Sequence, residues 1–475
     1  MCFAKPDEIT IPVRCAPKLA PCPHCGKMGR RQRTFTRRVR TIAYRKVAWL
    51  HITYGEYQAR CACRKYFRTT PADVLPKADY DNQVRQAVLD RILHDGLNVE
   101  RTREALRRDF LLELSDGFVY DCLDWQVRRL DLAEHRQAVL ARFSGTLCVD
   151  ELHLGSYTLL LATDPLADLP VAFALVKNND QGHMRRFLRN LQGWGLRPAV
   201  VVTDGSNLYP AVLAELWPQA RHQLCVFHVL KDINQKVLAA VRRARRGLAR
   251  RGRAGRKRRR GRRGQAQPAR ARRRGPTAKE KAHFVWKHRY LIVKRTEELG
   301  KQGWNDLVQM FEYLPELRTL WQFVRDVYQL FEAGQKGTAV AQRRRTRLVR
   351  DVDYQGVPEL VEALEMLAEE KFAKMVAFLR SPLGQRVRTN NHVERTNRKL
   401  RFYEKVRYKW RRRRTLVRFL VLALDQWWQR ARQRGQAAKE KGPGGGANEP
   451  SAKRPRPSVE TTDRIRTNTG APAGD

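Results

Sequence analysis

The chain has 475 residues, of which 95 are Lys or Arg and 48 are Asp or Glu, so its formal net charge is +47. A balance this basic is atypical of a metabolic enzyme and favours a polyanionic partner, above all nucleic acid. Hydrophobic residues make up 42% of the chain, which excludes a wholly disordered basic tail. The length predicts roughly two to four domains.

The sequence contains no membrane or secretion signal that we recognise. It has no run of about 18 apolar residues, so we expect no membrane span. Its N-terminal segment, MCFAKPDEIT, lacks the basic and then apolar pattern of a secretory signal. We therefore expect an intracellular, cytoplasmic protein, in which the nine cysteines bind metal or are buried rather than forming disulfides.

Two close pairs of cysteines lie near the N-terminus, Cys22 with Cys25 and Cys61 with Cys63. A Cys-x-x-Cys knuckle presents two thiolates to one ion, and the β-prone residues between the pairs suit a small strand pair. We predict a zinc-ribbon-like module over residues 1–75 that holds one Zn²⁺ ion. The second pair is one residue tighter than a usual knuckle, so buried, reduced cysteines in a small β unit are the alternative.

The next segment, residues 76–140, has the pattern of three helices. The first is expected over 83–95, the second is capped by Asn98, and the third begins near Ser115. This layout is typical of helix-turn-helix modules, in which the last helix enters the major groove of DNA. Arg128 and Arg129 would then contact phosphates. A three-helix unit with a purely structural role is the alternative.

Apolar β-rich runs alternate with helical patterns from residue 141 onward. The predicted order is strand 145–153, strand 156–163, strand 170–177, helix 183–193, strand 198–204, helix 209–217 and strand 221–228. This order is that of an RNase H-like mixed α/β fold. We expect this catalytic domain to span residues 141–430.

Three carboxylates have positions that suit one crevice. Asp150 lies within the first strand, and Asp204 ends the fourth strand, its expected neighbour. Glu151 should point to the opposite face of its strand, so we rank it below Asp150. Glu394 is one of only two acids between residues 386 and 418, a stretch with 14 Lys and Arg residues. Clustered carboxylates favour divalent cations, and two Mg²⁺ or Mn²⁺ ions support in-line phosphoryl transfer. A local ion pair is the alternative for Glu394.

The sequence resembles the DDE transposases of prokaryotic insertion sequences. The motifs that carry the resemblance are Cys148-Val-Asp150-Glu151, Val202-Thr-Asp204-Gly205, Leu224-Cys225-Val-Phe-His228-Val229 and Asn390-Asn-His392-Val-Glu394-Arg395. The resemblance implies that Asp150, Asp204 and Glu394 are the metal-binding triad. It also implies that Cys225 and His228, like the accessory Cys-x-x-His motif of Mutator-like transposases, support the active site.

The resemblance further implies a helical insertion before the catalytic glutamate, which would span residues 229–380. Within it, residues 242–274 contain 18 Lys and Arg and no acid. We expect this run to be solvated and disordered, with sequence-independent DNA wrapping as the alternative. His392 and Asn391, just before Glu394, would contact DNA or position the carboxylate. The basic residues expected to hold the DNA backbone around Glu394 are Arg395, Arg398, Lys399 and Arg401. The tail, 431–475, should be disordered.

These patterns predict an enzyme that binds the terminal inverted repeats of its element, cleaves double-stranded DNA in a metal-dependent step and transfers the strand to target DNA. Strand transfer joins paired ends, so we expect a homodimer or larger assembly on DNA, in the nucleoid. Two alternatives share some of these features: an RNase H-like nuclease or resolvase, and a non-catalytic DNA-binding relic of a transposase.

Overall fold

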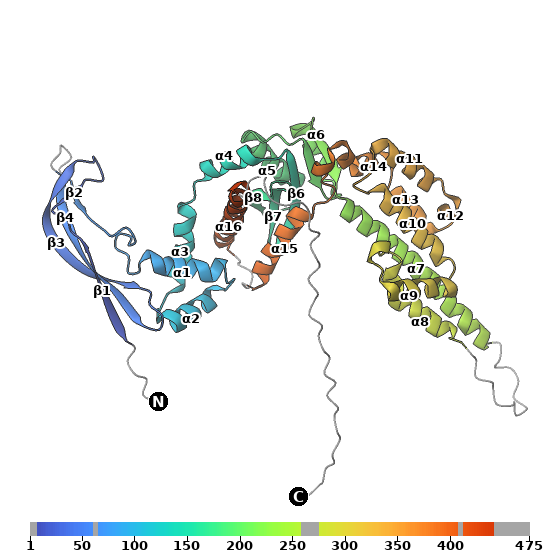
Figure 1. The fold of residues 1–475 in the computed structure, drawn as a ribbon, viewed down its shortest axis with the longest axis horizontal. Helices are drawn as coiled ribbons and strands as arrows, with labels where there is room; N and C mark the ends of the chain where they lie inside the picture. Colours follow the sequence, from blue (N-terminus) through green and yellow to red (C-terminus); the bar gives the residue numbers. More distant parts are fainter. Residues whose placement is uncertain (1–6, 60–64, 258–274, 407–411, 441–475) are drawn as a thin grey trace, which may run out of the picture. The chain divides into compact units, whose positions relative to one another are not determined.

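The computed structural model describes residues 7–59, 65–257, 275–406 and 412–440 (Figure 1). The chain divides into two compact units, Met1–Gln429 and Arg430–Asp475. The described part of the second unit consists of the last turns of α16 (Arg413–Glu440). Everything that follows concerns the first unit.

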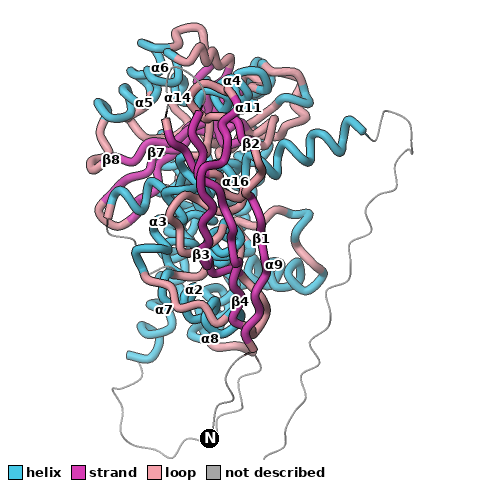
Figure 2. Tube along the Cα trace, turned by 90° about the vertical axis from the view of Figure 1, so that its left-hand side faces the viewer, coloured by secondary structure: helices cyan, strands magenta, loops and turns pink. Residues whose placement is uncertain are grey.

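The N-terminal region forms a five-stranded sheet, larger than the small strand pair that we predicted. Strand β3 (Met28–Thr41) runs antiparallel to β4 (Val47–Ala59), and Figure 2 shows the two lying side by side. Strand β1 (Glu8–Cys15) pairs in parallel with β4, and the short strands β2 (Leu19–Pro21) and β5 (Tyr66–Arg68) pair with β3 and β4. The intervening chain forms this larger sheet because its β-prone, alternating pattern extends well beyond the cysteine pairs.

Four helices follow: α1 (Asn82–Leu93), α2 (Val99–Phe110), α3 (Asp116–Arg128) and α4 (Leu132–Arg142). The first three begin where the sequence pattern placed them. The side chains of Asp81, Asn98 and Ser115 accept the backbone N–H bonds that cap their starts. The core between these helices also contains Phe419 and Leu422 of α16.

The central sheet has the strand order β10-β9-β6-β7-β8. Its first three strands are antiparallel, while β9 and β10 continue in parallel beside β6. This is the predicted mixed α/β arrangement, including the adjacency of the first and fourth strands. The bounds of its elements are β6 (Thr146–Leu154), β7 (Tyr157–Asp164), β8 (Leu169–Val176), α5 (Gln181–Gly193), β9 (Val200–Thr203), α6 (Pro210–Leu216) and β10 (Arg221–Leu224).

The last strand is shorter than predicted, since helix α7 (Val226–Lys257) begins two residues after β10 ends. The N–H of Cys225 still donates to the carbonyl of Thr203, at 2.8 Å, and the chain then turns into the helix. Cys225 therefore lies at a strand-to-helix junction, with His228 in the first turn of α7. The sequence of residues 224–229 alone fits both the end of a buried strand and the start of a buried helix, so the boundary could not be predicted from it.

The segment between β10 and Glu394 is helical, as expected, and has a hydrophobic core of its own. Its helices after α7 are α8 (Ala278–His288), α9 (Lys301–Tyr313), α10 (Leu317–Leu330), α11 (Thr338–Val349), α12 (Val352–Gln355), α13 (Pro358–Glu365) and α14 (Glu369–Met375). Short 3₁₀ turns lie at Arg289–Leu291, Thr296–Glu298, Ala377–Arg380 and Leu383–Gln385.

The start of the arginine-rich run is ordered, contrary to our expectation for the whole run. Helix α7 continues to Lys257, and residues 258–274 lie outside the described part of the chain. The guanidinium groups of Arg245 and Arg289 lie 4.9 and 4.0 Å from the ring centre of Trp286. Arg243 pairs with Glu359 at 2.8 Å. Cation–π stacking and ion pairing thus hold Arg243 and Arg245 of this run against the protein, whereas we expected the run to be solvated.

Helices α15 (Asn391–Val406) and α16 pack on one face of the central sheet. Val393 and Leu400 of α15 and Leu416 of α16 join Cys148 and Leu152 of β6 in one apolar cluster. The fold thereby returns Glu394 to β6 across the whole helical insertion. None of the helices in the described ranges offers an apolar stretch sufficient to traverse a lipid bilayer.

Candidate active site

Three carboxylates meet at the edge of the central sheet. Oxygens of Asp150, Glu151 and Asp204 all lie within 4.8 Å of one another, and all three side chains are half-buried. Asp204 follows the last residue of β9, and its Oδ1 accepts the N–H of Ser206 at 2.9 Å. This location at the carboxyl end of a parallel strand is where open α/β sheets place their ligands.

Glu151 belongs to this group in the structure, although we ranked it below Asp150. Strand alternation does put Asp150 and Glu151 on opposite faces, but β6 pairs with β9 only from Thr146 to Cys148. Beyond Cys148 none of the described strands pairs with that edge of β6. Both carboxylates can therefore turn around the open edge toward Asp204. The signal that could have found Glu151 is the short run Val200–Thr203, which ends the neighbouring strand early.

Burial, together with the close approach of these acids, raises the pKa values of Asp150 and Glu151. Burial, followed by the charge of Glu151, raises the pKa of Asp150 to about 7. Burial and the charge of Asp204 also raise the pKa of Glu151. Its Oε1 is buried and has no hydrogen-bond partner. Clustered carboxylate oxygens that repel one another fit hard divalent cations such as Mg²⁺ and Mn²⁺.

Glu394 lies beside a different pair of side chains. Its carboxylate, the Sγ of Cys225 and the imidazole of His228 form a second group whose ligand atoms lie within 4.8 Å of one another. The Nδ1 of His228 is 3.8 Å from Oε1 of Glu394, and both atoms are buried without a hydrogen-bond partner. The structure thus brings Glu394 together with Cys225 and His228, which share a different sequence motif.

Two asparagines connect the helix of Glu394 to β6. The Nδ2 of Asn390 donates to the carbonyl of Val149 at 3.0 Å, and the Nδ2 of Asn397 donates to Oδ2 of Asp150 at 2.8 Å. Asn397 lies three residues after Glu394, so the two share one side of α15. Helix α15 therefore contacts the acidic cluster through Asn397 and contributes Glu394 to the other group.

The sequence analysis assigned no role to Asn390 or Asn397. The signal that could have found them is a pair of neutral amides around a lone acid in a strongly basic segment. Both are buried in the structure, in contrast to the exposed cations around them.

Asn397→Ala is expected to slow DNA cleavage and weaken Mn²⁺ binding by at least about tenfold. The reason is that the change removes the donor that orients Asp150 and favours its charged form, and a hydrogen bond to a charged group contributes about 1.5–3 kcal/mol. Cleavage rates and Mn²⁺ titration would measure it. Asn190→Ala, on the exposed face of α5, is the matched control. Equal effects of the two changes would contradict the orienting role.

Helix α15 has one buried side with polar residues and one exposed side with basic residues. His392 is buried, with Nε2 3.0 Å from Oδ1 of Asp168, and burial lowers its pKa. Asn391, at the start of the helix, is exposed. Of the two residues predicted to contact DNA or position Glu394, only Asn391 is thus accessible. The predicted phosphate-binding residues are all exposed: Arg395, Arg398, Lys399 and Arg401.

The two arginines predicted to bind DNA from α3 are exposed but have intramolecular partners. Arg128 pairs with Asp124, which also pairs with Arg418 of α16. Arg129 lies 4.5 Å from the ring centre of Trp125. These contacts fix the end of α3 against α16.

The first cysteine pair lies in a tight turn after β2. The N–H of Cys22 donates to the carbonyl of Lys27, at 2.9 Å, and the N–H of Gly26 donates to the carbonyl of Cys22, at 2.8 Å. Cys22 is buried and Cys25 is exposed. Cys61 and Cys63 lie outside the described residues.

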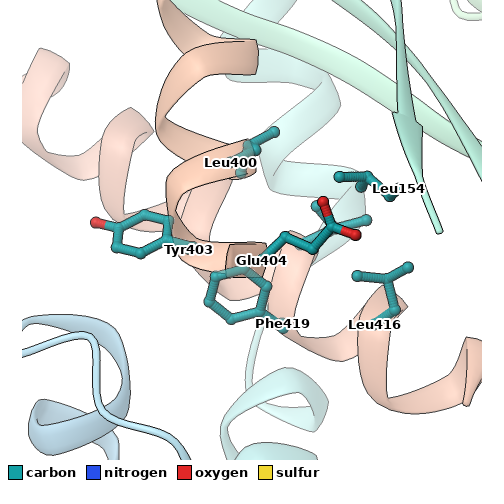
Figure 3. Close-up of a pocket in the computed structure, with 7 residues that line it drawn as sticks. Leu154, Leu400, Tyr403, Glu404, Leu416 and Phe419 are labelled. Atoms are coloured by element: carbon teal, nitrogen blue, oxygen red, sulfur yellow. The ribbon is translucent and has the colours of Figure 1, made fainter. Parts of the chain in front are cut away.

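A small pocket lies elsewhere, between β6, α15 and α16 (Figure 3). Its lining is apolar apart from Glu404 and the Tyr403 hydroxyl, as the side chains labelled in Figure 3 show. It brings together no set of reactive groups, so the acidic cluster remains the candidate active site.

Comparison with known proteins agrees with the chemistry of this site. Residues 147–417, more than half of the chain, match the transposase family ISL3, which is of the DDE type. No curated protein matches the chain. Among solved structures, the Drosophila P element transposase strand transfer complex is similar over 72% of this chain and 91% of that chain, with 10% sequence identity and a TM-score of 0.38. The family assignment rests on the sequence match, which includes Asp150, Asp204 and Glu394. The chain belongs to the ISL3 family of DDE transposases, enzymes that transfer phosphoryl groups on DNA during transposition.

Proposed function

We propose that this transposase cleaves DNA at the ends of its element and joins the freed 3′-hydroxyl to target DNA at one site, built by Asp150, Asp204 and Glu394. Glu151 is a further ligand in this proposal. The observation that supports it most directly is the cluster of three carboxylates at the open edge of β6. The helix that carries Glu394 is attached to this cluster through Asn397.

Two Mg²⁺ or Mn²⁺ ions bound by these carboxylates would activate the attacking water or 3′-hydroxyl and stabilise the leaving oxygen. Asp150 must lose its proton to bind such an ion, because its pKa of about 7 keeps part of the population protonated near neutral pH. Burial raises the pKa of Glu151 as well. Asn397 then orients Asp150 through its hydrogen bond. The residues provide carboxylates rather than a positioned Ser or Tyr nucleophile, so no covalent protein–DNA intermediate is expected.

The exposed side of α15 would hold the DNA backbone near this site. Its cations lie within one or two helical turns of Glu394, and phosphate contacts of this kind position DNA without reading its sequence. Recognition of the terminal inverted repeats would come from the N-terminal sheet and helices α1–α3, with the end of α3 in the major groove. We propose a homodimer or larger assembly on double-stranded DNA, in the cytoplasm and at the nucleoid.

Cleavage of a labelled duplex that carries the terminal repeats of the element tests this function. Nicking at the repeat boundary should require Mg²⁺ or Mn²⁺, stop in EDTA and be lost in Glu394→Gln. Binding to the repeats without cleavage would favour a DNA-binding relic. Cleavage that ignores the repeats would favour a general nuclease.

We also propose that one Zn²⁺ ion binds Cys22, Cys25, Cys61 and Cys63. The tight turn at Cys22–Gly26 supports this, because such turns present two thiolates to one ion. Cys22→Ser should lower the zinc content of the purified protein and the melting temperature of the N-terminal region. Cys122→Ala, a buried cysteine of α3, is the control. Unchanged zinc in Cys22→Ser would show that these cysteines do not bind it.

A further inference from the structure

The Cys225–His228–Glu394 group has the composition of a site for a different class of metal ion from the acidic cluster. Its three ligand types are a thiol, an imidazole and a single carboxylate, brought within 4.8 Å of one another. Zn²⁺ and other borderline or soft ions favour sulfur and nitrogen ligands, whereas Mg²⁺ prefers oxygen alone. We propose that this group is a second metal site, selective for Zn²⁺-like ions.

The unpartnered atoms of the group support this assignment. Nδ1 of His228 and Oε1 of Glu394 are both buried, lie 3.8 Å apart and have no hydrogen-bond partner. Burial of polar atoms without partners is costly, and a cation between them would remove that cost. The separation of these two atoms is close to that of two ligands on one tetrahedral ion with bonds near 2.0–2.2 Å.

The backbone around Cys225 also suits a metal-bound thiolate. Its Sγ accepts the N–H of Asn390 at 3.2 Å. Cys225 directly precedes the start of α7, whose first N–H groups also face the sulfur. Donated N–H bonds and a helix N-terminus stabilise a thiolate, which is the form of cysteine that binds metal. Burial acts in the opposite direction and raises the pKa of this thiol, so the bound ion would supply the remaining stabilisation.

The side chains of His228 and Glu394 are 33% and 25% exposed, although their facing Nδ1 and Oε1 atoms are buried. A tetrahedral ion held by these three residues would have a fourth position for a water or a DNA oxygen. Three protein ligands with an open position are typical of zinc sites that take part in chemistry or exchange their ion, rather than of closed structural sites. Because Glu394 lies on α15 beside Asn397, which contacts Asp150, such an ion would lie next to the acidic cluster. Glu394, a proposed ligand of the Mg²⁺ site as well, would be shared by the two sites.

Cobalt substitution in the full-length protein tests the site, because Co²⁺ bound to a thiolate gives an intense near-ultraviolet charge-transfer band. The experiment starts from a variant in which Cys22, Cys25, Cys61 and Cys63 are all changed to Ser, so that the proposed N-terminal zinc site does not contribute. In this background we expect a Co²⁺ band that Zn²⁺ abolishes and Mg²⁺ leaves unchanged. Adding Cys225→Ser should remove the band, and adding His228→Ala should weaken Co²⁺ binding by at least about tenfold.

The serine variant separates metal binding from a structural role, since its hydroxyl can still accept the N–H of Asn390. Cys122→Ala is the matched control and should keep the band. A band that survives Cys225→Ser, or no band in a folded background protein, would overturn the site. If the background protein does not fold, the bound Co²⁺ of wild type and Cys225→Ser is compared instead. An equal content would then overturn the site.

Neither readout uses DNA or catalysis. Absence of the band from the folded background protein, with Mg²⁺-dependent cleavage intact, would overturn this site alone. A band without any cleavage would overturn the proposed function and leave the site standing.

Discussion

Asp204→Asn is expected to abolish strand cleavage while leaving binding to the terminal repeats nearly intact. Asp204 lies at the end of β9 within 4.8 Å of Asp150 and Glu151, so its loss removes one metal-binding charge from the centre of the cluster. The helices proposed to bind DNA are separate elements, and asparagine keeps the side-chain oxygen that accepts the N–H of Ser206. The fold should therefore survive the change.

The expected loss is at least about 10³-fold in the cleavage rate. A bound ion contributes several kcal/mol to the stabilisation of transition-state charge, and each 1.4 kcal/mol corresponds to a factor of ten. Single-turnover cleavage and a gel-shift titration, run on the same labelled repeat end, would measure the two activities. Asp180→Asn, at the half-buried N-cap of α5, is the matched control. An equal loss of cleavage and binding in Asp204→Asn would contradict the catalytic role.

The affinity of the acidic cluster for Mn²⁺ is expected to rise by about tenfold per pH unit on the acidic side of pH 7 and to level off above it. The pKa of Asp150 is about 7, so below this pH a proton occupies the carboxylate that the ion needs. Above pH 7 that proton is gone and no longer competes. Isothermal titration at several pH values would give the slope.

The stability of the metal-free protein should depend on pH in the opposite sense. Because the pKa of Asp150 is raised on folding from its ordinary value of 3.8, the folded state holds this proton more tightly than the unfolded state does. The resulting stabilisation is complete below pH 4 and is lost as the pH rises through about 7. Saturating Mn²⁺ should therefore raise the melting temperature more at pH 8 than at pH 5.5. Asp150→Asn should remove most of that difference, and an equal gain at both pH values would contradict the cluster as the Mn²⁺ site.

Much of the site was predictable because its parts lie in strongly patterned elements. Asp150 and Asp204 follow apolar runs that form β6 and β9, so the order of strands alone placed them side by side. The helix starts at Asn98 and Ser115 could also be predicted, because a capping polar residue directly precedes each periodic run.

The parts that could not be predicted depend on where a strand stops or on contacts between distant segments. Glu151 joins the cluster because β9 ends early, and no periodic pattern in β6 reports the length of its neighbour. Asn397 and Cys225 were not placed beside Asp150 and Glu394 because those contacts cross the helical insertion. The same holds for Phe419, which belongs to α16 yet completes the core of helices α1–α3.

The hydrogen bonds from Asn390 to Val149 and from Asn397 to Asp150 join residues 241 and 247 positions apart in the chain. At a synthesis rate of about 5–20 residues per second, β6 is therefore made on the order of tens of seconds before its partner helix α15. An incomplete chain holds Asp150 and Asp204 without Glu394, and its first helices without Phe419. A chain that stops before α15 therefore lacks Glu394 of the proposed site, and it cannot close the core of helices α1–α3.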